Sequence, residues 1–327
     1  MSIETMIKAS DEAPSDSKSA TSKHDSLTRQ EIISNSFIFF LAGHETTANV
    51  LHFSMIDLAM NLPSQRRMQA DIDAIAGNRP SSEWSYIEDM PRLYNSMVGA
   101  VLNEVSRLIP AIPNIPKTTV GDQIVTIDGQ EFLLPDGVFI HINTVGTQRN
   151  PRYYPHSPSK ITGKEHDLDD FVPERWLPSK SAMEAEKGSQ QLEKKDEEAE
   201  DGLEKVSFET SGASSLFKPV KGAFVSFSEG PRSCPGRRFT QVEVMAVLAK
   251  IFSQYSVELD VCDWASDEEV EKMSKAQKRE VYQKALDHAH KMMRRCEQYI
   301  TLRLKKGDKV PLRFVERGRE RFVDIFD

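Results

Sequence analysis

Apolar residues of this chain recur at helical spacing along residues 32–60, after a polar segment, residues 1–26, that we expect to be a flexible lead. Thr28 and Glu31 have the spacing of a capping box at the start of the apolar pattern. The pattern predicts one long helix. Because the middle of this helix is apolar nearly all round, we also expect it to be buried.

A second helical pattern covers residues 93–110 and places Glu104 and Arg107 three positions apart, on one helix face. Short alternating runs separated by turn sequences occupy residues 117–145 and predict a small sheet. Another alternating stretch, residues 301–315, predicts a hairpin. The pattern as a whole favours a mainly α fold with a small β component.

Two strongly charged segments interrupt these patterns. Residues 179–215 have few apolar positions and are expected to form a solvated insertion. Residues 263–299 predict a highly charged helix or helix pair, which we also interpret as an insertion. With these two exceptions, residues 27–327 are expected to form one domain.

The composition limits the function classes. An apolar share of 39% and a charged share of 28% over 327 residues are typical of a globular chain, and the net charge of -8 argues against a nucleic-acid binder. The three cysteines have no close spacing, which argues against a disulfide framework and against a zinc cluster. The longest apolar run, FIFFLAG, is too short to span a bilayer, so we expect no membrane anchor in this chain.

One cysteine lies in a specific local pattern. Phe227, Gly230, Arg232, Cys234 and Gly236 form FxxGxRxCxG, directly before an amphipathic helix. Backbone N–H groups, the helix N-terminus and the neighbouring arginines would favour a thiolate, which is an iron ligand or a nucleophile. A lone cysteine is more often a small buried apolar residue, but glycines and an arginine at fixed offsets exceed what that role requires.

Four segments together resemble the cytochrome P450 family of haem-thiolate monooxygenases. In the family's order they are AGHETT at residues 42–47, EVSR at 104–107, PERW at 173–176 and FxxGxRxCxG at 227–236. The ordered set is far more specific than any one segment. The resemblance implies the cytochrome P450 fold with its amino-terminal half missing, so that the chain would be the carboxy-terminal part of a catalytic domain.

The resemblance assigns one face of a haem b group to the loop around Cys234. Cys234 would be the thiolate ligand of the iron, and Phe227 would pack beside its sulfur. Arg232 would pair with a haem propionate. Gly230 and Gly236 would let the backbone turn and approach the haem.

The resemblance assigns the other face of the haem to the long helix. Ala42 would leave room for dioxygen, Thr46 could donate its hydroxyl to it, and Glu45 would relay protons from solvent. The alternative for Thr46 is an ordinary hydrogen bond to the Ala42 carbonyl. Lys117 matches, more loosely, a basic residue near a propionate.

Glu104, Arg107 and Arg175 would form a buried ion network that fixes the cysteine loop, so that losing one member leaves an unpaired buried charge. The alternative is that Glu104 and Arg107 are an ordinary surface pair.

These assignments imply a monooxygenase that inserts one oxygen atom from O2 into a small organic substrate, with electrons from NADPH–cytochrome P450 reductase. The motifs are similar to those of eukaryotic microsomal members, fungal enzymes of secondary metabolism among them. Members of that type lie on the cytoplasmic face of the endoplasmic reticulum through an amino-terminal anchor.

Two alternatives remain open at this point. One is a haem-thiolate isomerase or dehydratase, which needs no external electrons. The other is a non-catalytic or partner-dependent fragment without a closed haem pocket. A partial fold would also leave the long helix partly uncovered, as an exposed apolar surface.

Overall fold

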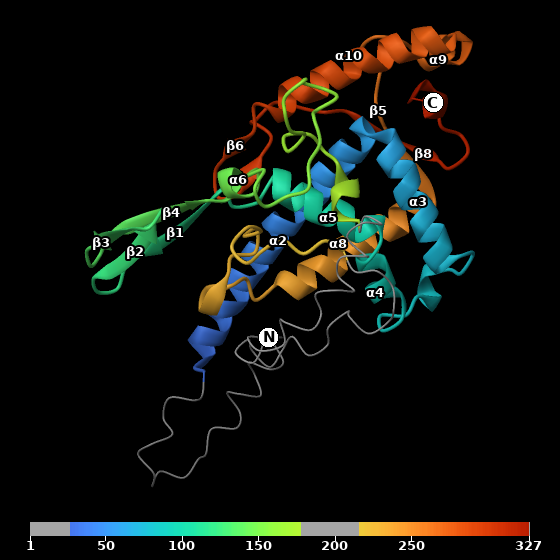
Figure 1. Cartoon of the computed structure of the whole chain (residues 1–327). Helices are drawn as coiled ribbons and strands as arrows, with labels where there is room; N and C mark the ends of the chain where they lie inside the picture. Colours follow the sequence, from blue (N-terminus) through green and yellow to red (C-terminus); the bar gives the residue numbers. More distant parts are fainter. Residues whose placement is uncertain (1–26, 178–215, 327) are drawn as a thin grey trace, which may run out of the picture.

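Helix α2 (Arg29–Met60) runs through the middle of the computed structural model (Figure 1). The structure describes residues 27–177 and 216–326. The lead predicted at residues 1–26 and the insertion predicted at 179–215 lie outside these described residues. Among the helices of the described residues, none combines the length and the apolar composition that a membrane span requires.

The start of α2 is fixed by the predicted capping box. The Glu31 N–H donates to Thr28 Oγ1 at 3.3 Å, and the Thr28 N–H donates to the Glu31 carboxylate at 2.7 Å. These two bonds satisfy donors that the first turn of a helix would otherwise leave without partners.

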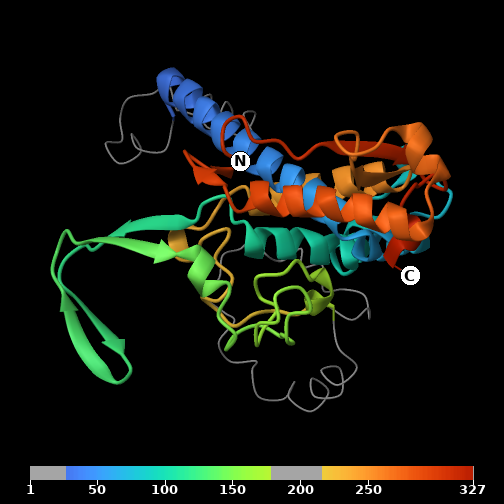
Figure 2. The same cartoon turned by 90° about the horizontal axis from the view of Figure 1, so that it is seen from above.

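The two halves of α2 differ in burial. Phe53, Ile56 and Leu58 in the second half are buried in the main core. The first half carries a run of exposed apolar side chains and extends beyond the neighbouring helices (Figures 1 and 2): Ile33, Phe37, Ile38, Phe39, Phe40 and Leu41. The prediction of a buried helix is therefore wrong for this half, and the expected exposed apolar surface is confirmed.

Helices α3 (Leu62–Ala76), α5 (Met97–Leu108) and α8 (Arg237–Phe252) pack against α2. Helix α4 (Asp89–Tyr94) packs against these three helices. All 12 residues of α5 are buried. The helix predicted over residues 93–110 is in fact broken before Met97, where the Ser96 hydroxyl caps α5 by accepting from the Val98 N–H.

The segment predicted to form a small sheet contains four strands in two separate antiparallel pairs. Strand β1 (Asn114–Thr118) pairs with β4 (Phe139–Asn143), and β2 (Gln123–Ile127) pairs with β3 (Gln130–Leu134). Asp128 and Gly129 both have positive φ, which matches the two-residue turn that joins twisted strands. Figure 2 shows these strands as an arm that projects from the helices.

The prediction of a hairpin over residues 301–315 is wrong. Strand β7 (Leu302–Arg303) pairs with β6 (Glu297–Gln298), and β8 (Leu312–Glu316) pairs with β5 (Tyr255–Leu259). The alternation identified extended segments correctly, but alternation alone does not choose the partner of a strand.

The charged segment at residues 263–299 contains the predicted helix pair, α9 (Asp267–Lys272) and α10 (Lys275–Met293). One face of α10 is part of the core, because Tyr282 is fully buried and donates its hydroxyl to the Ala59 carbonyl at 2.6 Å. The remaining elements are short: η1 (Ser81–Glu83), α6 (Thr144–Thr147), η2 (Pro173–Trp176), η3 (Gly230–Arg232) and η4 (Val323–Phe326).

Candidate functional site

Cys234 lies exposed in a closely bonded loop that leads into α8. Its N–H donates to the Phe227 carbonyl at 2.8 Å, and its own carbonyl accepts from the Arg237 N–H at 3.3 Å. The short turn η3 lies between Phe227 and the cysteine. These bonds fix the backbone on both sides of the sulfur while leaving the sulfur itself accessible.

The two glycines of the loop have different roles. Gly230 has φ of 75°, a left-handed conformation that favours glycine, and Ser228 nearby has φ of 58°. Gly236 has φ of -88°, which any residue can adopt. A Cβ at Gly236 would lie 3.8 Å from the sulfur of Cys234, so this glycine keeps the space beside the sulfur open.

Three further predicted residues lie in or against the loop: Phe227, Lys117 and Arg232. The guanidinium of Arg237 lies over the Phe227 ring, 5.8 Å from its centroid. Lys117 on β1 donates to the Ser228 hydroxyl at 3.5 Å, which connects the strand arm to the loop. Arg232, the last residue of η3, is exposed.

Glu104 is the centre of a buried ion network. Its carboxylate accepts from Arg107 at 2.8 and 2.9 Å, from Arg175 at 3.0 Å and from the Trp176 indole N–H at 2.8 Å. Burial alone would raise the pKa of Glu104, but the charges of the two arginines and the hydrogen bonds from Arg107 and Trp176 hold that pKa below its ordinary value. The surface-pair interpretation is therefore wrong.

Gln148, which the sequence analysis missed, connects this network to the cysteine loop. Arg107 Nη1 donates to the Gln148 carbonyl at 3.0 Å, and Gln148 Nε2 donates to the Arg107 carbonyl at 3.0 Å. Gln148 Oε1 accepts from the Val225 N–H and from the Ser226 hydroxyl, both at 2.9 Å. Ser226 directly precedes the motif that holds Cys234. No local pattern in the sequence distinguishes Gln148, which directly follows α6 as its C-cap residue.

The predicted residues of α2 lie where its exposed half meets its buried half. Ala42 is exposed, and Thr46 donates its hydroxyl to the Ala42 carbonyl at 2.7 Å. The structure thus has the ordinary helix bond that was the alternative for Thr46. Glu45 Oε1 accepts from the Thr301 hydroxyl at 2.8 Å, a partner that no pattern around Glu45 indicates.

The structure brings most of the predicted residues into one region. Helix α2 packs against α8, and in both views the exposed half of α2 lies at the same end of the molecule as the loop of Cys234 (Figures 1 and 2).

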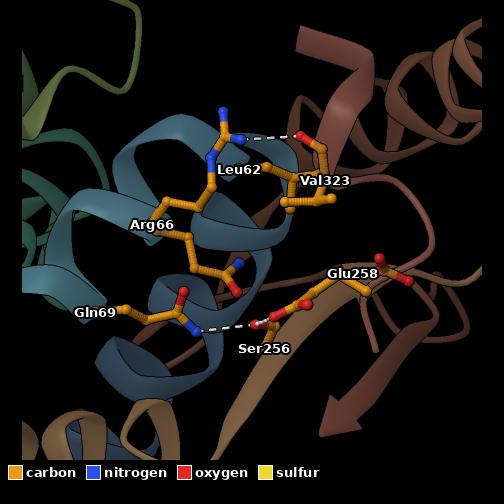
Figure 3. A pocket seen from close by; sticks show the side chains of 8 residues that line it. Leu62, Arg66, Gln69, Ser256, Glu258 and Val323 are labelled. Carbon is orange, nitrogen blue, oxygen red and sulfur yellow. Dashed lines mark hydrogen bonds between the residues drawn. The ribbon is translucent and has the colours of Figure 1, made fainter. Parts of the chain in front are cut away.

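A separate hollow lies between α3, β5 and η4 (Figure 3). Arg66 donates to the Val323 carbonyl at 3.0 Å across it, and Gln69 donates to the Ser256 hydroxyl at 2.9 Å. Its volume of about 20 Å³ is far below the roughly 300 Å³ or more of a ligand pocket. None of the predicted site residues lines this hollow, so we do not interpret the hollow as the functional site.

The residues around Cys234 fit a haem held by one thiolate. The described residues contain no group of three His, Cys, Asp or Glu side chains that could hold a metal ion. Asp260 raises the pKa of Cys262, and burial raises the pKa of Cys296 to about 11, so both favour the thiol. Cys234 alone among the three cysteines combines exposure with a fixed loop at a helix start, and the cationic side chains of Arg232 and Lys117 lie in or against that loop.

The family model described as Cytochrome P450 matches residues 11–283. The chain belongs to the cytochrome P450 family. The resemblance seen in the motifs is thereby confirmed. Members of this family are haem-thiolate proteins that bind haem b.

Similar proteins include a cytochrome P450 monooxygenase of Arthrobotrys oligospora, 30% identical over 284 residues that cover 86% of this chain and 42% of the relative. Cytochrome P450 monooxygenase 124 of Postia placenta is 27% identical, over 73% of this chain and 37% of the relative. Cytochrome P450 3A5 of Homo sapiens is 25% identical, over 72% and 36%. The chain thus spans less than half of the length of these relatives.

A solved structure supports the fold. A crystal structure of a cytochrome P450, CYP102L1, matches 95% of this chain and 50% of that chain with a TM-score of 0.57 at 18% identity. The cytochrome P450 fold, mainly α with a small β component, is therefore confirmed for the part that matches.

Proposed function

We propose that the chain forms the haem-thiolate part of a monooxygenase that inserts one oxygen atom from O2 into a small organic substrate. The observation that carries the proposal is the exposed Cys234 in a loop that Gln148 connects to the buried Glu104 network. A haem b bound there would supply the activation of O2, because a thiolate ligand favours cleavage of the O–O bond.

On the loop side, each residue would have a binding task. Cys234 would hold the iron, and Gly236 would keep side-chain atoms away from the sulfur. Arg232 and Lys117 would bind the propionates by charge-assisted hydrogen bonds. The Glu104 network would keep the loop in this shape before the haem arrives.

On the helix side, the chain would move protons. The Thr46 hydroxyl would leave the Ala42 carbonyl and donate to the reacting dioxygen, at the cost of one hydrogen bond of about 1 kcal/mol. Glu45, which is partly exposed, would exchange protons with solvent and renew the proton on Thr46.

The electron source and the substrate class are part of the same proposal. Electrons would come from NADPH through a cytochrome P450 reductase, and the substrate would belong to secondary metabolism. The support is the similarity of the motifs to those of fungal members, together with relatives named as fungal cytochrome P450 monooxygenases.

We also propose that turnover requires another polypeptide segment over the exposed half of α2. Phe37 and Phe40 are 64% and 71% exposed in a run of apolar residues, and such patches mark interaction surfaces. An uncovered site would admit water, so that reduced oxygen would leave as peroxide.

The bond from Thr46 to Ala42 favours one second candidate, a haem-thiolate isomerase or dehydratase. Such an enzyme would not need the Thr46 proton and would turn over without NADPH or reductase.

The test is to express residues 1–327 and measure haem per chain, the carbon monoxide difference spectrum of the reduced protein, NADPH use with reductase, and product against peroxide. We expect a thiolate-type spectrum, incomplete haem occupancy and a high share of peroxide. Absence of a thiolate-type spectrum at any haem loading would overturn the haem-thiolate proposal. Full occupancy with tightly coupled product would overturn the need for a covering segment.

A further inference from the structure

A buried hydroxyl connects two residues on one face of α2. Thr301, directly before β7, is 1% exposed. Its Oγ1 donates to Glu45 Oε1 at 2.8 Å and accepts from Asn49 Nδ2 at 2.7 Å. Because Glu45 and Asn49 are four positions apart, they lie one above the other on the helix. A single side chain from far along the sequence thus holds both.

The direction of each hydrogen bond in this group is determined. The Asn49 amide nitrogen can only donate, so Thr301 Oγ1 must accept from it and direct its one proton to Glu45. An ionised Glu45 can only accept, and a hydrogen bond to a charged group is stronger than one between neutral groups. Because Thr301 is buried, water does not compete for its proton.

Thr301 is also held in place by its own backbone surroundings. The Leu302 N–H donates to the Ala111 carbonyl at 2.9 Å, and the Tyr299 N–H donates to the Thr301 carbonyl at 3.2 Å. The hydroxyl is therefore presented from a fixed turn rather than from a free loop.

We propose that Thr301 is the positioning residue for Glu45, holding its carboxylate in one orientation while it relays protons from solvent. This inference rests on the proposed function, in which Glu45 exchanges protons with solvent. Proton transfer needs donor and acceptor within hydrogen-bond reach, and a partly exposed glutamate without an anchor divides its time among several rotamers. Thr301 acts through Glu45 and not on substrate or haem.

The contact is tested on the full chain by carbon-13 NMR of glutamate side chains, which requires no turnover. The Glu45 carboxylate signal is assigned by its loss in Glu45→Gln. We expect Thr301→Val, which keeps the shape but removes the hydroxyl, to shift this signal, and Thr301→Ser to restore it. Thr119→Val is the matched control, because the buried Thr119 also donates one bond, to the Pro135 carbonyl, and accepts another.

The consequence is tested on haem-loaded protein with reductase. We expect Thr301→Val to lower product per NADPH by about fivefold, the factor that the loss of one typical hydrogen bond gives. Thr301→Ser should recover most of the yield, and Thr119→Val should leave it unchanged.

Two results would overturn the positioning role of Thr301 while leaving the proton role of Glu45 intact. One is a Glu45 signal that stays in place in Thr301→Val or moves equally in Thr119→Val. The other is an unchanged yield in Thr301→Val beside a reduced yield in Glu45→Gln. An unchanged yield in Glu45→Gln itself would show instead that the proton role of Glu45 is wrong, and the positioning role would be lost with it.

Discussion

The side-chain oxygen of Gln148 accepts a hydrogen bond from the backbone N–H of Val225 at 2.9 Å, while the backbone carbonyl of Gln148 accepts one from Arg107. One residue thus fastens the start of the cysteine loop to the buried ion network. The network and the loop are far apart in sequence, so this residue connects two segments that no local pattern joins.

We predict that Gln148→Leu lowers haem affinity more than its loss of stability explains. The substitution leaves the Val225 N–H buried without its partner, which costs about 1 to 3 kcal/mol, and it releases the start of the loop. Urea unfolding and haem titration measure the two effects. Gln65→Leu is the matched control, because Gln65 is also buried and bonds to both the N–H and the carbonyl of Val257, in a region away from the loop. Equal haem affinity in the two variants would contradict the prediction.

The cysteines provide a second prediction. Cys234→Ala should abolish the thiolate-type carbon monoxide spectrum, because Cys234 alone among the three combines exposure with a fixed loop. Cys262→Ala and Cys296→Ala should leave the spectrum intact, since the pKa of each of these thiols is raised. The spectrum of each reduced variant is the measurement. An equal loss in either of the other two variants would refute the assignment of Cys234.

A third prediction concerns the buried ion network. Arg107→Ala should lower the free energy of unfolding by about 3 to 5 kcal/mol, because it leaves the fully buried Glu104 without its main partner. We expect haem retention to fall more than activity per bound haem. Glu280→Ala, which breaks the exposed pair with Lys284, is the control and should change stability by under about 0.5 kcal/mol. Similar losses in both variants would show that burial does not govern the effect.

Features of the fold and of the candidate site could be predicted where residues close together in the sequence determine them. The capping box of Thr28 and the motif of Cys234 were visible because neighbouring residues in the sequence determine them. Gln148 and Thr301 were missed because their roles exist only once distant segments meet. The error over residues 301–315 has the same origin, since each of its strands pairs with a different segment. The burial of α2 was misjudged because burial depends on what covers a helix as well as on its own residues.

A fourth prediction follows from Asp57, a buried acid on α2 whose Oδ2 has no hydrogen-bond partner among the described residues. Burial, and then the nearby charge of Glu104, raise the pKa of Asp57 from 3.8 to about 8. Between pH 3.8 and about pH 8, the unfolded chain has lost the carboxyl proton of Asp57, whereas the folded chain keeps it. Stability therefore falls as pH rises through this window, by up to about 1.4 kcal/mol per pH unit.

Asp57→Asn, which resembles the neutral acid, should remove this dependence. Its free energy of unfolding should exceed that of the unchanged chain by a margin that widens from pH 5 to pH 8, as measured by urea unfolding of both proteins at each pH. The difference between the two proteins isolates Asp57 from every other titrating group. A margin that stays constant across the range would show that Asp57 ionises normally.

The last prediction separates the exposed half of α2 from its buried half. Phe37→Glu with Phe40→Glu should raise solubility and change the free energy of unfolding by under about 0.5 kcal/mol, since both rings already lie in water. Phe53→Ala, in the same helix but 1% exposed, should cost about 3 to 5 kcal/mol. Light scattering and urea unfolding of the three proteins measure these effects. If the double variant instead unfolds as easily as Phe53→Ala, the first half of α2 is covered within the chain itself, and the proposal that another segment must cover it fails.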